Sequence, residues 1–264
     1  MRLTFIAPSA PRPSGGVAVI YEMASAMARR GHHVDLFHVD LFRSAVSSVD
    51  ELDWFDFPPG ITRHFAPAGD FNPDVPPGVV FGFPFDTELP DQVLPVVLIQ
   101  GYKMLGDDVE RHAYEARCPK ICVARWLVDI GRALGVPSNE LVHVPVGLRH
   151  DTFHLTRPVE GRPLRIAYCY SSHAMKGAPL AIDVLSQVKE KVPEVEVVMF
   201  GAAAPEHDLP DWISYVTRPD ERYLVDEIYN SSRVFLCTSS VEGFGLANVE
   251  AMACGAALVT TANG

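Results

Sequence analysis

Long apolar runs, an even set of cysteines and an excess of basic residues are all missing from this 264-residue sequence. No stretch approaches the run of about eighteen apolar residues that a membrane-spanning helix requires, and the amino-terminal apolar run is too short for the core of a signal peptide. The five cysteines are an odd number, which favours reduced thiols over a disulfide framework. We therefore expect a cytoplasmic protein without a transmembrane segment.

The charge balance is acidic, with 33 Asp and Glu against 22 Lys and Arg, and a formal net charge of -11. This balance argues against nucleic acid as a partner. Cys118 and Cys122 have the spacing of half a metal site, but no second pair and no histidine couple follows them at zinc spacing. We therefore expect no metal site. Apolar residues make up 48% of the chain, enough to bury a substantial core.

The first half of the chain alternates short apolar runs with one clear amphipathic segment. The run RLTFIAP predicts a buried strand, and the residues after it predict a turn and a helix that stops at Gly31. Further strands are expected at HVDLFHV, GVVFGF, PVVLIQG, KICVA and LVHVPV, because buried parallel strands form continuous apolar runs. The segments SVDELDWFDFPPG and FNPDVPPG between them are expected to be loops.

The alternation lapses around residues 148–162 and then begins again. The restarted pattern predicts strands at LRIAYCY, VEVVMFG, VFLCTS and ALVTT, with helices at APLAIDVLSQVKEKV, ERYLVDEIYNSS and LANVEAMACG. We therefore expect an α/β fold of two Rossmann-like parallel-sheet lobes that face a cleft. The expected boundaries are 1–147 for the first lobe, 148–162 for a linker and 163–264 for the second lobe.

The closing stretch SSVEGFGLANVEAMACG places two carboxylates around the start of a helix. Gly243 and Gly245 let the backbone approach a ligand closely, and the first N–H groups of a helix attract phosphates. Glu242 then lies where it can reach hydroxyl groups on the phosphate's substituent, and Glu250 suits a vicinal diol such as a ribose. The alternative is an ordinary glycine turn with Glu250 as a solvated helix residue, and these residues alone leave both open.

The same stretch resembles the E-x7-E region of retaining glycosyltransferases of family four, which have the GT-B fold. The resemblance implies that Glu242 contacts the donor sugar, that the backbone of Gly243, Phe244, Gly245 and Leu246 holds the diphosphate, and that Glu250 binds the ribose. Family members usually continue beyond the last strand seen here. The resemblance therefore implies an incomplete second lobe, with exposed apolar surface near Val259.

The segment SSHAMKGAPLAIDVL resembles the loop and helix that follow the first strand of the family's second lobe. Lys176 then matches the lysine that neutralises the donor phosphates, and Ser171 and His173 lie in the same donor-side loop. A cation is required there because the diphosphate gains negative charge as it leaves. The family usually has an arginine five or six residues before this lysine, whereas this sequence has Tyr170 and Ser171.

In the first lobe, PSGGVAVIYEMASAMARRG resembles the family's glycine-rich loop and first helix, so Gly15 and Gly16 are expected near the donor. This loop lacks the G-x-G-x-x-G pattern of dinucleotide enzymes. Gln100 stands where many relatives have a histidine close to the reacting sugar. Tyr102 and Lys103 follow it and are candidates for acceptor contact.

Taken together, the resemblance implies an enzyme, a metal-independent retaining glycosyltransferase without a cofactor. It would move a sugar from a nucleotide-diphosphate donor to a hydroxyl acceptor, such as a glycan. Two alternatives remain open: a non-catalytic nucleotide-sugar-binding protein, and a nucleotide-sugar epimerase on the same fold. The motifs do not fix the base, the sugar, the acceptor or the oligomeric state.

Overall fold

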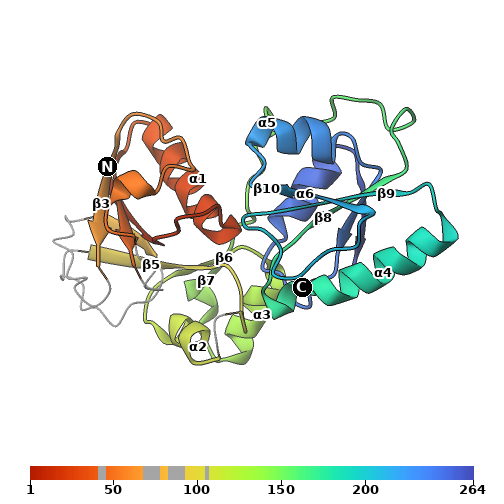
Figure 1. Cartoon of the computed structure of the whole chain (residues 1–264). Coiled ribbons are helices and arrows are strands. Elements are labelled where there is room, and N and C mark those ends of the chain that lie inside the picture. Colours follow the sequence, from red (N-terminus) through yellow and green to blue (C-terminus); the bar gives the residue numbers. More distant parts are fainter. Residues whose placement is uncertain (41–45, 68–77, 83–92, 105–106) are drawn as a thin grey trace. The chain divides into compact units, whose positions relative to one another are not determined.

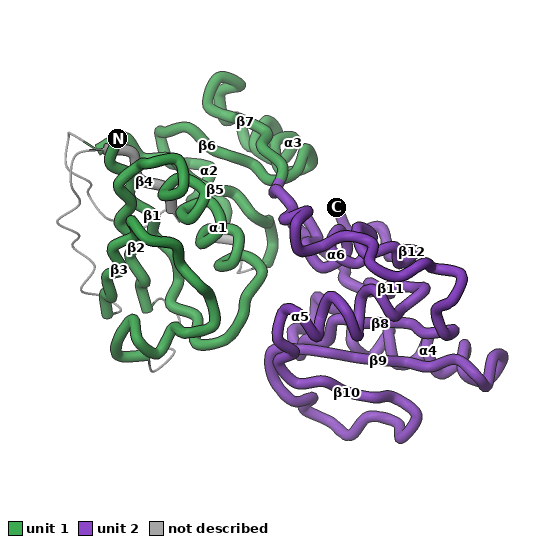
Figure 2. The backbone as a smooth tube through the Cα atoms, turned by 90° about the horizontal axis from the view of Figure 1, so that it is seen from above, with its two compact units in different colours: residues 1–145 green, residues 146–264 purple. Residues whose placement is uncertain are grey.

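The computed structural model describes residues 1–40, 46–67, 78–82, 93–104 and 107–264. The chain divides into two compact units, Met1–Pro145 (unit 1) and Val146–Gly264 (unit 2). They are drawn in green and purple in Figure 2. Each unit is an α/β structure built on a wholly parallel sheet (Figure 1).

Within its described residues, unit 1 has a seven-stranded sheet with the order β3-β2-β1-β4-β5-β6-β7. Its strands are β1 (Arg2–Pro8), β2 (His33–Val39), β3 (Ile61–Ala66), β4 (Gly78–Gly82), β5 (Val93–Ile99), β6 (Lys120–Cys122) and β7 (Leu141–His143). Its helices are α1 (Gly15–Arg29), α2 (Asp107–Glu115) and α3 (Arg125–Ala133), with short 3-10 turns at Val49–Glu51 and Ser138–Glu140. Every adjacent pair of strands is parallel.

The apolar periodicity of unit 1 predicted its central strands and α1, and both are confirmed. Helix α1 buries Val17, Ile20 and Tyr21 against the sheet, and the chain leaves it through Gly31 at φ +82°. Such a φ strongly favours glycine, which explains the predicted stop. The strand β3 and the helices α2 and α3 were not predicted. Strand β3 carries the polar residues of TRH, which obscure its apolar pattern.

The predicted loop SVDELDWFDFPPG is irregular apart from its 3-10 turn, but it is anchored. Trp54 Nε1 donates a hydrogen bond of 2.7 Å to the Ala10 carbonyl, and the indole stacks on Tyr21 at 5.1 Å between ring centroids. The second predicted loop, FNPDVPPG, lies outside the described residues except for its last glycine, where β4 begins.

The described sheet of unit 2 has five strands in the order β10-β9-β8-β11-β12. They are β8 (Arg165–Cys169), β9 (Glu196–Gly201), β10 (Ile213–Thr217), β11 (Val234–Cys237) and β12 (Ala257–Thr260). The helical segments are a 3-10 turn (Ala174–Lys176), α4 (Ala178–Lys191), α5 (Glu221–Tyr223), a π-helix (Leu224–Tyr229) and α6 (Leu246–Ala253). All pairs of strands are again parallel.

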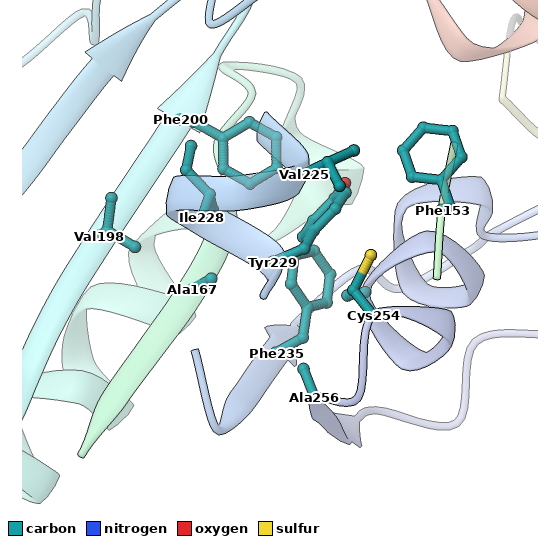
Figure 3. Close-up of a cluster of buried hydrophobic side chains, with 11 residues drawn as sticks. Phe153, Ala167, Val198, Phe200, Val225, Ile228, Tyr229, Phe235, Cys254 and Ala256 are labelled. Carbon is teal, nitrogen blue, oxygen red and sulfur yellow. The ribbon is translucent and has the colours of Figure 1, made fainter. Parts of the chain in front are cut away.

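Helices cover both faces of this sheet (Figure 1). On one face, α4 contributes Ala181 and Leu185 to a core shared with Tyr168, Met199 and Leu236. On the other face, the π-helix and α6 pack on the second core cluster (Figure 3). The buried residues of that cluster are Phe153, Ala167, Val198, Phe200, Val225, Ile228, Tyr229, Phe235, Ala251, Cys254 and Ala256.

The strand order places a topological switch point in each sheet. In unit 2 the first strand, β8, lies between β9 and β11, so the chain runs outward from β8 in one direction and later returns to add β11 and β12 on the other side. In open α/β sheets, ligands bind at the carboxyl ends of the two strands that flank such a point. Those ends belong to β8 and β11.

Residues 148–162, predicted as an inter-domain linker, lie in unit 2 because the chain divides after Pro145. Phe153 is 5% exposed and sits in the core cluster of that unit. Arg162 is 4% exposed and donates hydrogen bonds to the carbonyl groups of Tyr229, Ser232 and Cys254. The lapse in apolar periodicity therefore reflects an irregular segment, which the hydrogen bonds of the buried Arg162 guanidinium hold against the core of unit 2.

Two further elements of unit 2 differ from prediction. The segment ERYLVDEIYNSS is one α-helical turn followed by the π-helix, in place of a continuous α-helix. Strand β10 was not predicted, because ISYVT lacks a long apolar run. The predicted exposure near Val259 is confirmed: this residue lies on the edge strand β12 and is 52% exposed.

Candidate functional site

The loops after β8 and β11 are hydrogen-bonded to each other. The Ser240 N–H donates to the Met175 carbonyl at 2.8 Å, and Thr238 Oγ1 donates to the Gly177 carbonyl at 2.9 Å. Gly177 has a φ of +67°, and a Cβ atom there would lie 2.3 Å from the Thr238 carbonyl oxygen. Only glycine permits this close approach, which brings the two loops together at the switch point.

Lys176 and Glu242 are joined across these loops, although they lie 66 positions apart in the sequence. Lys176 Nζ is 2.7 Å from Glu242 Oε1, and Ser239 Oγ donates to the same oxygen at 2.6 Å. The Lys176 and Glu242 side chains are 29% and 15% exposed, so water screens this pair less than an open surface pair. One ammonium, one carboxylate and one hydroxyl group therefore converge at the carboxyl edge of the sheet.

The start of α6 lies directly after this cluster. Gly245 precedes the helix in the left-handed region, at φ +75°, where a side chain would be strained. The first helical bonds run from the Asn248 and Val249 N–H groups to the Gly245 carbonyl, at 2.9 and 3.2 Å. The N–H groups of Leu246 and Ala247 therefore fall in the helix's first turn, where the helix supplies no acceptor and its dipole favours an anion.

The loop that carries Glu242 is also tied to the segment after β12. The Glu242 N–H donates to the Asn263 carbonyl at 2.7 Å, and Thr261 Oγ1 donates to the Ser239 carbonyl. Asn263 Nδ2 lies 3.4 Å from Cys237 Sγ at the end of β11. Both the backbone and the side chain of Glu242 are therefore held in place.

Glu250 lies one turn into α6 and is partly buried. Tyr229 Oη donates to Glu250 Oε2 at 2.9 Å. Burial raises the pKa of the Glu250 carboxyl to about 7, while the Tyr229 hydrogen bond and the charge of Arg149 act in the opposite direction. Glu250 is thus not a fully solvated helix residue, and an incoming hydroxyl group would meet a poorly hydrated carboxylate.

The thiols of Cys169 and Cys254 lie close to Glu250. Cys169 ends β8 near Lys176, Glu242 and Glu250, and burial raises the pKa of its thiol to about 12. It is therefore protonated at neutral pH and is a poor nucleophile. All five cysteines are described and are free thiols. Within the described ranges, no group of three or more His, Cys, Asp or Glu side chains is placed to hold a metal ion.

The remaining donor-side residues of the β8 loop make local contacts. Ser171 Oγ accepts a hydrogen bond from the His173 N–H at 3.3 Å, and the His173 side chain is exposed. The Tyr170 hydroxyl accepts from the Glu206 N–H at 3.3 Å, and its ring packs edge-on against Tyr215. Of the two positions at which the resemblance predicts an arginine, Tyr170 thus packs against a residue of β10 and Ser171 makes a local hydrogen bond.

In unit 1, the structure brings Gln100 to the glycine-rich loop. Gln100 follows β5, and its Nε2 donates to the Gly16 carbonyl at 3.1 Å, while Gly15 opens α1 in an exposed position. Tyr102 packs edge-on against Tyr114, and Lys103 is exposed with a φ of +63°. Of the predicted residues of unit 1, Gln100 and Gly16 are thus in direct contact.

Sequence reasoning missed Ser239, Asn263 and Tyr229, each of which makes a hydrogen bond to a predicted glutamate. Ser239 and Asn263 carry no periodic signal because they lie in loops. Tyr229 falls within a segment whose sequence predicts an ordinary helix. Its one available signal is the polar run Asn230 to Ser232 directly after an apolar segment, since buried polar residues need specific partners.

Two consecutive parallel-sheet units with this strand order define the class: the fold is GT-B-like, with Rossmann-like units. In the residues that the structure describes, no helix has the length and apolar character needed to cross a bilayer. Solved structures of the same fold cover nearly the whole chain.

Sucrose-phosphate synthase from Thermosynechococcus elongatus is similar over 100% of this chain and 82% of its own, with a TM-score of 0.72 and 17% identity. WaaG, a glycosyltransferase involved in lipopolysaccharide biosynthesis, is similar over 98% of this chain and 81% of its own, with a TM-score of 0.74 and 13% identity. Anabaena HepE, in complex with UDP and glucose, is similar over 100% of this chain and 81% of its own, with a TM-score of 0.69 and 15% identity. At such identities the similarity shows the fold.

The family evidence comes from the sequence of unit 2. Residues 158–264 match the family described as glycosyl transferases group 1. This match includes Lys176, Glu242 and Glu250, so all three residues lie within the part of the chain that resembles this family. No curated protein sequence matches the chain.

Proposed function

We propose that this protein is a retaining glycosyltransferase that transfers a sugar from a nucleotide-diphosphate donor to a hydroxyl acceptor. The observation that carries the proposal is the convergence of Lys176, Glu242 and the start of α6 at the switch point of unit 2. A cation and a helix N-terminus suit a diphosphate, and the two carboxylates suit hydroxyl groups on either side of it.

In this mechanism, the bond between the anomeric carbon and the diphosphate breaks, and a bond to the acceptor oxygen forms on the same face of the sugar. The acceptor proton leaves with the diphosphate. Lys176 and the first N–H groups of α6 stabilise the departing charge, since prearranged donors need no reorganisation during the reaction. Glu242 binds hydroxyl groups of the donor sugar, and Glu250 binds the ribose.

The pairing of Lys176 with Glu242 adds a step that the sequence did not predict. A donor diphosphate would compete with Glu242 for the Lys176 ammonium, and the released carboxylate oxygen would accept a sugar hydroxyl group. Ser239 would keep Glu242 in place during this exchange, because it donates to the same oxygen. Donor binding would thereby replace one charge-assisted contact with two others.

The first test measures donor binding. A thermal-shift panel with UDP-, GDP-, ADP- and dTDP-sugars identifies the nucleotide, since a ligand at one hundred times its dissociation constant adds about 2.7 kcal/mol of stability. HepE was solved with UDP and glucose, so UDP-glucose is the first donor to try. Binding without any release of nucleoside diphosphate would favour the non-catalytic alternative, which the tyrosine at position 170 also motivates.

The second test measures turnover. Lys176→Ala and Glu242→Ala are each expected to lower the release of nucleoside diphosphate about 100-fold, the effect of losing one prearranged electrostatic contact. Lys191→Ala and Glu190→Ala, which change exposed residues of α4, are the matched controls. Near-normal rates in both site variants would refute the proposed roles. Conversion of the donor to an isomer of equal mass, without acceptor, would indicate an epimerase.

A further inference from the structure

Tyr229 is one of the largest fully buried side chains of the protein and ends a π-helix. It lies within the cluster of Figure 3, and its ring is edge-on to those of Phe200 and Phe235, with centroid distances of 5.8 and 5.7 Å. Its hydroxyl group nevertheless reaches the carboxylate of Glu250 on a different helix. A buried polar atom aimed at one partner requires an explanation beyond packing.

The π-helix determines the direction in which the Tyr229 side chain points. The Asn230 N–H donates to the Val225 carbonyl, five residues back, at 2.9 Å, which is the π-type bond. The buried Asn230 amide fixes this turn: it donates to the His154 carbonyl at 3.0 Å and accepts from the Thr156 N–H at 2.8 Å. The wider turn and its anchor thereby set the direction in which Tyr229 leaves the helix.

The contact occupies one side of the carboxylate. Tyr229 Oη donates to the Oε2 atom of Glu250 at 2.9 Å. A carboxylate on a helix surface has several rotamers, and ordering it costs free energy that a ligand would otherwise have to supply. The tyrosine fixes one rotamer before a ligand arrives.

We infer that Tyr229 is a positioning residue for ribose recognition, which holds the Glu250 carboxylate so that it can accept the ribose hydroxyl groups of the donor. This inference rests on the proposed function, because it takes the ligand of Glu250 to be a ribose. Tyr229 would then contribute to donor binding without touching donor or acceptor. The π-helix would contribute by directing Tyr229 toward Glu250.

The charged and titratable groups around Glu250 come from several elements. They are Tyr229 of the π-helix, Arg149 before the core residue Phe153, Glu221 of α5, Cys169 of β8 and Cys254 after α6. Among these groups, Tyr229 makes the hydrogen bond to Glu250, and that bond favours the ionised carboxylate. Loss of the hydroxyl group should therefore move the titration of Glu250 to higher pH.

The test compares a ribose ligand with its deoxy analogue. Calorimetry measures the dissociation constants of UDP and 2′-deoxy-UDP for wild type, Tyr229→Phe and Glu250→Gln between pH 5.5 and 8.5. Wild type should prefer UDP, and the preference should grow as Glu250 ionises. Tyr229→Phe should reduce the preference about tenfold at pH 7.5, the effect of one hydrogen bond to a charged group, and should shift its pH midpoint upward.

Tyr215→Phe is the matched control, because Tyr215 also loses a hydroxyl group that is hydrogen-bonded, to the Ala203 carbonyl. A purely structural role for Tyr229 predicts equal weakening of both ligands and no midpoint shift, which would overturn the inference. A preference lost in Glu250→Gln but intact in Tyr229→Phe would overturn it while leaving the proposed function standing. An unchanged preference in Glu250→Gln, or no nucleotide binding by wild type, would overturn both.

Discussion

Glu250→Gln should raise the unfolding free energy of the protein at alkaline pH and, under the proposed function, weaken donor binding. Burial raises the pKa of the Glu250 carboxyl from 4.5 to about 7 in the folded protein. The folded state therefore binds its proton more tightly than the unfolded chain does. The contribution of Glu250 to the unfolding free energy is most favourable below pH 4.5, falls as pH rises from about 4.5 to about 7, and stays reduced above that range.

The magnitude follows from the size of the shift. One unit of pKa corresponds to about 1.4 kcal/mol, so ionised Glu250 costs the fold up to about 3 kcal/mol at pH 8.5. Glutamine has nearly the same shape and can still accept the hydrogen bond from Tyr229, but it carries no charge to desolvate. The variant should therefore exceed wild type in unfolding free energy by up to about 3 kcal/mol at pH 8.5 and by well under 1 kcal/mol at pH 4.5.

The assay is urea unfolding of both proteins at these two pH values, with Glu190→Gln on the exposed face of α4 as the control. The informative quantity is the difference between variant and wild type, since the titration of other groups cancels in it. A difference that is the same at pH 4.5 and pH 8.5 would refute the argument. Under the proposed function, the stabilised variant should also bind its donor more weakly, because functional groups are often kept at a cost in stability.

Three further substitutions test other parts of unit 2. Gly245→Ala places a side chain at φ +75° before α6 and should destabilise the protein by about 1 kcal/mol or more, measured by urea unfolding. Ser239→Ala removes the hydroxyl group that donates to Glu242 and should lower turnover roughly tenfold, measured by release of nucleoside diphosphate. Arg162→Ala should lower the unfolding free energy by about 3 kcal/mol, because it leaves several buried carbonyl groups without their donor.

Two of these predictions have a control variant, and the third has an outcome that would contradict it. Ser240→Ala removes an exposed hydroxyl group of the same loop, and equal losses in both serine variants would contradict the role given to Ser239. Arg222→Ala removes a guanidinium group that is 92% exposed, so its effect on stability should be small. A Gly245→Ala variant as stable as wild type would mean that the turn before α6 has a φ that alanine tolerates.

The local chemistry of the site could be predicted from the sequence. Glu242, the glycines after it and Glu250 stand within nine residues of one another, so a strand, a turn and a helix suffice to place them. Gly31 and Gly245 likewise show their roles locally, because a positive φ favours glycine wherever it occurs. The strands with long apolar runs could also be predicted in both sheets, because a strand that is buried on both faces consists almost entirely of apolar residues.

Predictions failed where stability comes from a few distant contacts. Arg162 lies in a segment without apolar periodicity, yet its hydrogen bonds to residues about seventy or more positions away fix that segment to unit 2. Strand β10 has a short and mixed sequence, and pairing with β9 gives it its structure. Periodicity reports which residues are buried, but it says nothing about which partner buries them.

By itself, the sequence determined a parallel α/β fold in two parts and the residue types of the proposed diphosphate and sugar site. Only the tertiary structure decided that Lys176 meets Glu242 and that Tyr229 holds Glu250. The first contact exists because β11 pairs with β8 across the switch point, and the second because a π-helix turns a buried tyrosine toward α6. Strand order and helix type depend on how the whole core packs, so no short stretch of sequence encodes them.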